Sequence, residues 1–423
     1  MGRAMSTSRP DTDDTADVPT TDTPAPDTAA PGTAATATSD GSGPTVADLG
    51  EFGLIRAITR RLPAGPDVLL GPGDDAAVVA SADGRVVITT DLLLEGRHFR
   101  RDWSSAYDVG RKAAAQNLSD VVAMGARPTT LVVGLGVPRS LPIAWAEQFA
   151  DGLRDECELV GASVAGGDIS SSDTIVLGIT ALGDLAGRAP VRRDTARHGD
   201  LVVLAGRLGW AQAGLALLRA TTATAATTAT AATTATTGAV SAATATTGAV
   251  SATATGAAAT ATGATAAAGG TAAAPAVRLD DPEYAELVAA HRRPQPPYPL
   301  GPQLAAAGAH AMCDISDGLL ADLGHIAAAS SVWIDLDTAL IRVPARISAA
   351  AAALDADPLG WVLTGGDDHA LVACVAPGTE LPAGCTVIGR VLNERPADAG
   401  TRDHGVLVNG RDQHHQPGWD HFA

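Results

Sequence analysis

Residues 220–277 contain no charged side chain and consist mostly of Ala, Thr and Gly, which limits what the middle of this chain can fold into. The segment TATTGAVSA occurs twice within this tract, starting at Thr234 and at Thr244. Thr and Gly weaken the helix that Ala favours, and a solenoid repeat needs larger apolar side chains to stack on its neighbours. We therefore expect a flexible insertion inside a folded domain.

The N-terminal residues 1–49 are rich in Thr, Pro, Asp and Ala and have few large apolar side chains. Such a segment cannot bury enough surface to offset its ordering entropy, so we expect a disordered tail. Its start lacks the apolar core of a signal peptide, and the 220–277 tract lacks the Leu, Ile and Phe of a membrane span. We expect a cytoplasmic protein with no membrane contact.

The rest of the chain is long enough for two domains with cores of their own, which we place at 50–190 and 191–423. Helical and strand patterns alternate along it, so the expected class is mixed, α+β or α/β. Helices are expected at 50–62, 108–126, 143–161, 211–220 and 303–309. Strands are expected at 86–94, 129–138, 174–183 and 201–209, in a strand-turn-helix unit at 310–330, and within 361–375 and 385–391.

The chain is acidic, with 47 Asp and Glu against 29 Lys and Arg and a net charge of −18. It has no basic stripe for nucleic acid. If it binds an anionic nucleotide, cations must screen the phosphates. The single lysine, Lys112, is followed by Ala113, so there is no Walker P-loop, and the HRD and DFG motifs of protein kinases are missing too. ATP would therefore be held by carboxylate-bound metals, arginines and backbone amides.

The most informative pattern is a set of aspartates at the ends of apolar runs, often beside glycine. Each one alone is more simply explained as a turn former or helix cap. Together they suggest carboxylates that converge on one cleft, where they would repel one another unless cations bound, and Mg²⁺ prefers such hard oxygen ligands. The set comprises Asp74, Asp75, Asp91, Asp168, Asp314, Asp317, Asp367 and Asp368, with Asp120 added from a helix.

Several longer motifs occur in a fixed order across residues 50–219 and 275–423. They are GEFGLI, GPGDDAA, TTDLLLEGRHF, KAAAQNLSDVVAMGA, GGD, DISDGLLADLGHI, LTGGDD and GWDHF. In this combination the ordered chain resembles the bacterial thiamine-monophosphate kinase family, of the superfamily shared with aminoimidazole ribonucleotide synthetase.

The resemblance implies two α/β domains with the active site between them. The N-terminal domain would pair with its copy to form a dimer barrel, and the C-terminal domain would be layered. It also implies phosphorylation of thiamine monophosphate to thiamine diphosphate by a homodimer, with ATP as co-substrate and Mg²⁺ as cofactor. Removal of residues 221–274 is expected to leave this activity largely unchanged, because a long surface loop costs little to close.

Site residues follow from the resemblance position by position. Asp91, Asp120 and Asp168 are the expected catalytic centre. Gly167, Asp168, Ser316 and Arg193 would contact the nucleotide, with Arg192 as the alternative to Arg193. His98, Asp367 and Trp419 would contact thiamine monophosphate. The implied metal ligands are Asp74, Thr89, Thr90, Asp91, Asp120, Asp168, Asp314 and Asp317.

The chain departs from the family pattern in two places and leaves other functions open. It reads GGDIS where the family has GGDTT, and GGDDHA where the family has GGEDYE, so Asp367 replaces a longer carboxylate and His369 a tyrosine. A catalytically impaired nucleotide-binding protein is therefore one alternative. Others are selenophosphate synthetase, although no cysteine precedes Cys157, and the hydrogenase maturation dehydratase, although the last cysteine is Cys385.

Overall fold

The computed structural model describes residues 43–72, 76–222, 281–396 and 402–412. Residues from Gly43 onward group into one compact unit. The predicted tail up to residue 42 and the predicted insertion beyond residue 222 lie outside the described residues, as do Asp74, Asp75 and Trp419. No helix in the described ranges is long and apolar enough to cross a membrane.

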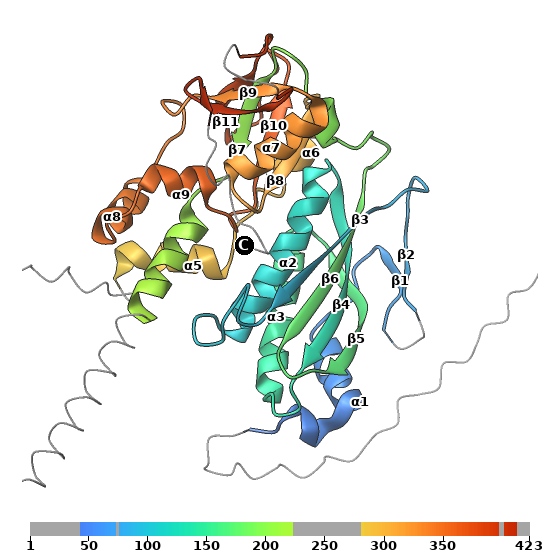
Figure 1. Cartoon of the computed structure of the whole chain (residues 1–423). Helices are drawn as coiled ribbons and strands as arrows, with labels where there is room; N and C mark the ends of the chain where they lie inside the picture. The colour runs from blue at the N-terminus through green and yellow to red at the C-terminus, as the bar shows by residue number, and fades with distance from the viewer. Residues whose placement is uncertain (1–42, 73–75, 223–280, 397–401, 413–423) are drawn as a thin grey trace, which may run out of the picture. The chain divides into compact units, whose positions relative to one another are not determined.

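Helices and strands alternate along the chain, as expected for a mixed α/β protein (Figure 1). The helices are α1 (Val46–Thr59), α2 (Ala106–Ala123), α3 (Ile143–Glu158), the short η1 (Arg193–Thr195), a helix at 210–222, α5 (Pro282–Arg292), α6 (Leu300–Ala306), α7 (Leu319–Ser330), α8 (Ala345–Ala353) and α9 (Pro358–Thr364). The strands are β1 (Val68–Leu70), β2 (Val78–Val79), β3 (Val87–Leu94), β4 (Arg127–Val137), β5 (Ser163–Ser171), β6 (Val176–Asp184), β7 (Leu201–Ala205), β8 (Ala311–Ile315), β9 (Trp333–Leu336), β10 (Ala370–Val375), β11 (Cys385–Val391), β12 (Gly405–Val408) and β13 (Arg411–Asp412).

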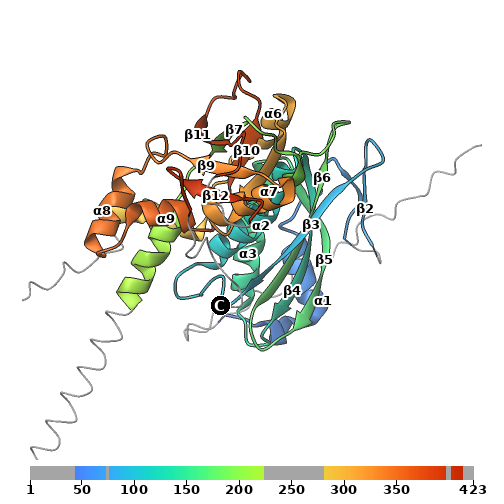
Figure 2. The same cartoon turned by 45° about the horizontal axis from the view of Figure 1, so that its top comes forward.

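A four-stranded sheet forms the first half of the structure, with strand order β3-β6-β4-β5. β3 pairs with β6 and β6 with β4 in antiparallel fashion, whereas β4 and β5 run parallel. β3 and β5 are therefore the two edge strands, three strand spacings apart. Helices α2 and α3 pack side by side along one face of this sheet (Figures 1 and 2).

Helix α2 is the central element, because it packs against both the first sheet and strand β8 of the second. Its start is fixed by a capping box, in which Ser105 and Asp108 exchange hydrogen bonds. Gly110 lets α3 approach closely, since a Cβ there would lie 2.2 Å from the carbonyl oxygen of Phe149. The buried faces of α2 place its polar residues, including Lys112, Asn117 and Asp120, at fixed positions between the two sheets.

A seven-stranded sheet forms the second half, in the order β13-β12-β9-β11-β7-β10-β8. Its pairs are antiparallel except for β12 with β9. Helix α7 packs against β8, β9 and β12, and a second core cluster lies around this helix and the sheet. The predicted boundary at residue 190 falls between the last strand of the first sheet and the first strand of the second, and it stays a prediction.

Three local expectations differ from the structure. Residues 361–364 were expected in a strand but belong to helix α9, whose start is favoured by Pro358 and by Asp357, which accepts a hydrogen bond from the backbone N–H of Leu359. Helix α1 begins at Val46, inside the segment expected as a tail, because Thr45 and Asp48 form a capping box. No strand was expected around Asp168, but this residue lies inside strand β5, Ser163–Ser171.

Candidate functional site

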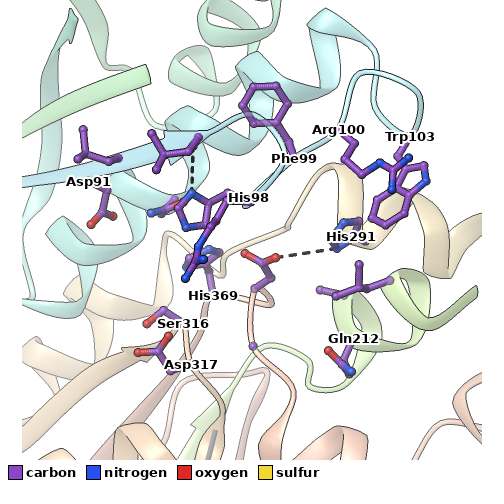
Figure 3. Close-up of a pocket in the computed structure, with 18 of the residues that line it drawn as sticks. Asp91, His98, Phe99, Arg100, Trp103, Gln212, His291, Ser316, Asp317 and His369 are labelled. Carbon is purple, nitrogen blue, oxygen red and sulfur yellow. Dashed lines mark hydrogen bonds and ion pairs between the residues drawn. The ribbon is translucent and has the colours of Figure 1, made fainter. Parts of the chain in front are cut away.

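A pocket of about 1060 Å³ lies where β3 and α2 meet β8, the segment 364–369, the helix at 210–222 and α5. Aspartates gather at one end of it, and histidine, arginine and aromatic side chains from 97–103 and α5 line the other end (Figure 3). Eight of the predicted site residues line it: Thr90, Asp91, His98, Asp120, Asp314, Ser316, Asp317 and Asp367.

The acidic end is built where β3 faces α2. The backbone N–H of Asp91 donates to Asn117 Oδ1 at 3.1 Å, and the hydroxyl of Thr89 donates to Asp120 Oδ2 at 2.7 Å. Thr89 thus lies behind the pocket wall and holds Asp120. Because strand side chains alternate between faces, Thr89 and Asp91 point toward α2 while Thr90 points to the other face of the sheet.

Asp120 shows how closely the carboxylates converge. Burial, together with the nearby charges of Asp314 and Asp91, raises the pKa of Asp120 to about 7, although the hydrogen bond from Thr89 and the charge of His369 act in the opposite direction. Like charges that meet in a buried site disfavour the ionised form. A bound cation would remove this repulsion.

Strand β8 and the turn before α7 supply the opposite wall of the acidic end. Asp314 is buried within β8, and Ser316 and Asp317 follow in the turn. The turn is held by Asp322, whose Oδ2 accepts hydrogen bonds from the backbone N–H groups of Asp317 and Gly318 at 3.0 and 3.1 Å. Asp322 therefore fixes the predicted ligand Asp317 without itself lining the pocket.

The segment 364–369 connects the two ends. Its backbone is tied to the β8 turn, because the N–H of Asp367 donates to the carbonyl of Ser316 at 2.9 Å. Asp367 and His369 adopt left-handed backbone conformations, with φ of 68° and 51°. Between them, Asp368 turns away and accepts hydrogen bonds from the backbone N–H groups of Trp210 and Ala211, which caps the helix at 210–222.

The two residues of the GGDDHA motif that depart from the family pattern, Asp367 and His369, both have partners in the structure. Lys112 Nζ lies 2.7 Å from Asp367 Oδ2, and His369 Nδ1 lies 3.2 Å from Asp314 Oδ2. Burial alone would lower the pKa of His369, but the hydrogen bond and charge of Asp314 outweigh it, so this pKa is raised. His369 therefore provides a hydrogen-bonding partner for Asp314 at the acidic end.

The second end is formed by the segment after β3. The backbone N–H of Leu94 donates to His98 Nδ1 at 3.0 Å, which places the ring proton of a neutral His98 on Nε2. Arg100 lies over the ring of Trp103, 4.4 Å from its centroid, and Figure 3 shows both beside Phe99 and His291 at this end. Aromatic faces and a carboxylate suit an organic cation better than a phosphate.

Asp168 and Gly167 do not join the pocket in this chain. They lie in the edge strand β5, and Asp168 is two residues beyond Gly166, which pairs with Val132. Thr90 pairs with Thr180, Thr180 with Val132, and Val132 with Gly166, so these residues share the face of the sheet that points away from α2. Asp168 lies on the same face as Gly166 and therefore opposite to Asp91. With strands about 4.8 Å apart, β3 and β5 are separated by about 14 Å.

Gly167 has a packing role of its own, since a Cβ there would lie 2.0 Å from the carbonyl oxygen of Val133. Arg193 lies in η1, where its carbonyl accepts a hydrogen bond from the Ser330 hydroxyl at 2.8 Å, and Arg192 pairs with Asp194. Neither arginine lines the pocket. Asp74 and Trp419 lie outside the described residues.

No group of three or more His, Cys, Asp or Glu side chains within the described ranges is arranged to hold a metal ion by itself. Sequence reasoning also missed His291, which lines the pocket, and Lys112, which pairs with the lining residue Asp367. Lys112 could have been suspected as the only lysine in a strongly acidic chain, whereas His291 gave no signal within its helical segment.

Comparisons with known proteins identify a family for this chain. The family described as "AIR synthase related protein, N-terminal domain" matches residues 73–185. A thiamine-monophosphate kinase of Mycobacterium tuberculosis (strain ATCC 25618 / H37Rv) is 42% identical over 90% of this chain and 94% of its own length. A thiamine-monophosphate kinase of Corynebacterium glutamicum is 35% identical over 85% of this chain and 92% of its own length.

Solved structures give the same picture. The thiamine-monophosphate kinase of Stenotrophomonas maltophilia K279a matches with a TM-score of 0.62 at 30% identity, over 86% of this chain and 98% of that one. AaThiL complexed with AMPPCP and TMP matches with a TM-score of 0.61 at 27% identity, over 88% and 97%. The hydrogenase maturation protein HypE in complex with ATP shares the fold alone, with a TM-score of 0.55 at 18% identity over 85% and 90%.

Proposed function

The chain belongs to the thiamine-monophosphate kinase family, and we propose that it transfers the γ-phosphoryl group of ATP to thiamine monophosphate in the pocket described above. The observation that carries this proposal is that the pocket has two unlike ends. One end gathers carboxylates suited to metal-bound phosphates, and the other offers aromatic and histidine side chains suited to an organic ring.

The attacking group is a phosphate oxygen of thiamine monophosphate, which is already ionised at neutral pH. No strong general base is therefore required, and positioning and charge stabilisation account for most of the catalysis. Asp91, Asp120 and Asp314 hold the charge-bearing end, while His98 and Asp367 contact thiamine monophosphate. Trp419 would join them from outside the described residues.

The acidic end fits Mg²⁺. The pocket carboxylates repel one another, and the described residues offer no complete ligand set of their own, which suits an ion that takes one or two carboxylates and completes its shell with phosphate oxygens. The proposed ligands are Asp91, Asp120, Asp314 and Asp317, with Thr89, Thr90, Asp168 and Asp74. When bound, Mg²⁺ would neutralise the phosphate oxygens and keep the two anions close.

The nucleotide contacts proposed for Ser316, Gly167, Asp168 and Arg193 require more than one chain. Ser316 lies in the pocket, but Gly167 and Asp168 lie at the far edge of the sheet. The face that carries Asp168 also exposes Ile88 and Leu92, with 65% and 59% of their surface accessible. Apolar side chains on an open sheet face favour burial against a partner.

We propose that two copies pair through this face as a homodimer and that Asp168 and Gly167 of one copy reach the pocket of the other. The protein would act in the cytoplasm.

The reaction is tested by incubating the purified protein with ATP, Mg²⁺ and thiamine monophosphate and separating the products by chromatography. We expect thiamine diphosphate and ADP in equal amounts, and no product after chelation of Mg²⁺. ATP binding without any diphosphate would instead favour the catalytically impaired nucleotide-binding protein.

The shared site is tested by co-expressing two inactive variants, Asp168→Asn and Asp314→Asn. If each pocket takes Asp314 from one copy and Asp168 from the other, mixed dimers keep one intact site, and random pairing restores about a quarter of the wild-type activity. If both residues act within one chain, each chain keeps a defect and the mixture stays inactive.

A further inference from the structure

Three polar groups meet at the junction of the two pocket ends. Asp367 comes from the segment 364–369, Lys112 from α2 and His291 from α5. Asp367 and His291 both line the pocket, and Figure 3 shows the ring of His291 among the lining side chains. His291 and Lys112 are absent from the residues that the family resemblance implies for this site.

Lys112 holds Asp367 in place. Its Nζ lies 2.7 Å from Asp367 Oδ2, and its side chain is only 4% exposed, whereas that of Asp367 is 37% exposed. The lysine therefore pairs with the carboxylate from behind and leaves part of it open to the pocket. Although burial raises the pKa of Asp367, the charged groups beside it, Lys112 first among them, lower that pKa to about 2, so the carboxylate stays an acceptor.

His291 presents a polar atom that no described residue uses for a hydrogen bond. The residue is 5% exposed and lines the pocket, and its buried Nδ1 has no hydrogen-bond partner in the described structure. Nδ1 lies 3.9 Å from Asp367 Oδ2, which is too far for a hydrogen bond. A buried polar atom without a partner costs free energy, so its retention indicates a ligand.

The position of His291 is fixed by packing. Helix α5 lies against the helix at 210–222 at Gly214, where a Cβ would be 2.1 Å from the carbonyl oxygen of Leu287 and 3.0 Å from the Cβ of His291. Burial, helped by the charge of Lys112, lowers the pKa of His291 to about 3, so the ring is neutral at physiological pH. A neutral imidazole has one donor nitrogen and one acceptor nitrogen.

We propose that His291 is a specificity-determining residue that, beside the carboxylate held by Lys112, recognises the aminopyrimidine edge of thiamine monophosphate. An aminopyrimidine presents an exocyclic amine, which donates, next to a ring nitrogen, which accepts. Asp367 accepts from the amine and His291 binds the ring nitrogen through a protonated Nδ1. This inference rests on the proposed function and deepens it, because it assigns one ring of the substrate to one pair of side chains.

The alternative occupant of this position, a phosphate group, is disfavoured by its hydrogen-bonding pattern. The ionised Asp367 only accepts hydrogen bonds, and a phosphate dianion, which also only accepts, would offer it no donor. The neutral ring of His291 adds no positive charge. The pair thus matches a neutral donor and acceptor edge, which a phosphate lacks.

The test compares thiamine monophosphate with oxythiamine monophosphate, in which an oxygen replaces the amine and the donor and acceptor positions are exchanged. For each enzyme, the KM for thiamine monophosphate and the inhibition constant of oxythiamine monophosphate are measured. His291→Phe keeps a ring but removes both nitrogens, and the matched control His291→Asn keeps a polar atom near the position of Nδ1.

We expect His291→Phe to reduce the preference for thiamine monophosphate over the analogue about tenfold, the effect of one neutral hydrogen bond, with kcat changed little. His291→Asn should keep most of the preference. A merely structural role for His291 would weaken binding of both compounds equally and leave the ratio unchanged, and that result would overturn the inference. Wild-type protein that makes no thiamine diphosphate would instead reject the proposed function.

Discussion

Two parts of the pocket contain aspartates whose pKa values are shifted in opposite directions. At one end Asp120 lies near Asp91 and Asp314, and its pKa is raised to about 7. Where the acidic end meets the second end, Asp367 is paired with Lys112, and its pKa is lowered to about 2. The protein supplies a cation, Lys112, to the carboxylate that we propose contacts the organic substrate. The charge of the other carboxylates is left for a bound cation to balance.

The largest effect is expected when the internal cation is removed. Lys112→Met leaves Asp367 without its partner and makes this end resemble the acidic end. We expect a loss of about 2 kcal/mol in the free energy of unfolding, less than for a fully buried pair because Asp367 is partly exposed. Urea denaturation measures this loss. Lys112→Met with Asp367→Asn should recover most of it, and equal stability of the single and double variants would contradict the pairing.

A smaller effect of opposite sign is expected at the acidic end. The pKa of Asp120 is raised above its ordinary value, so its contribution to stability is present at low pH and is lost as the pH rises from about 4 through about 7. Asp120→Asn removes this loss and keeps an oxygen that accepts from Thr89. In the presence of a chelator, the variant should melt about 2–4 °C above wild type at pH 8, as about 1 kcal/mol does in a chain of this size.

The same comparison at pH 4 should show almost no difference in melting temperature. The exposed Asp173→Asn serves as the matched control and should show no trend with pH. A constant offset between wild type and Asp120→Asn at all pH values would show that Asp120 does not carry the repulsion.

The smallest effect is expected far from both ends. The insertion was expected to be removable from residue 221. However, Trp103 Nε1 donates to the Thr222 hydroxyl at 3.0 Å, and this bond connects the second end of the pocket to the last described turn of the helix at 210–222. A deletion of 226–274 keeps this contact and should leave kcat/KM within about twofold of wild type. A deletion of 221–274 serves as the comparison and should raise KM more than the shorter one. An equal effect of both would show that the Thr222 contact is unimportant.

The sequence predicted the residues of the site better than their arrangement. Of the residues in the acidic motifs, Asp91, Asp120, Asp314 and Asp317 line one pocket, and their role as metal ligands stays a prediction. Asp168 could not be placed, because the strand order β3-β6-β4-β5 depends on long-range pairing, which local patterns do not determine.

The Lys112–Asp367 pair was missed for a similar reason, since its partners are 255 positions apart in the chain. The helix at Pro358–Thr364 was missed because the apolar run WVL suits either a strand or a short helix, and the signals that decide, Asp357 and Pro358, precede it. In both cases the residues that determine the structure lie outside the sequence segment from which the prediction was made.

The central claim is that the acidic end transfers the phosphoryl group while the Lys112 end holds the organic part of the substrate. The most direct measurement is the steady-state kinetics of Asp120→Asn beside Asp367→Asn. We expect Asp120→Asn to lower kcat at least about 100-fold, whereas Asp367→Asn should mainly raise the KM for thiamine monophosphate. Near-normal kcat in Asp120→Asn, or an equal loss of kcat in both variants, would contradict this division.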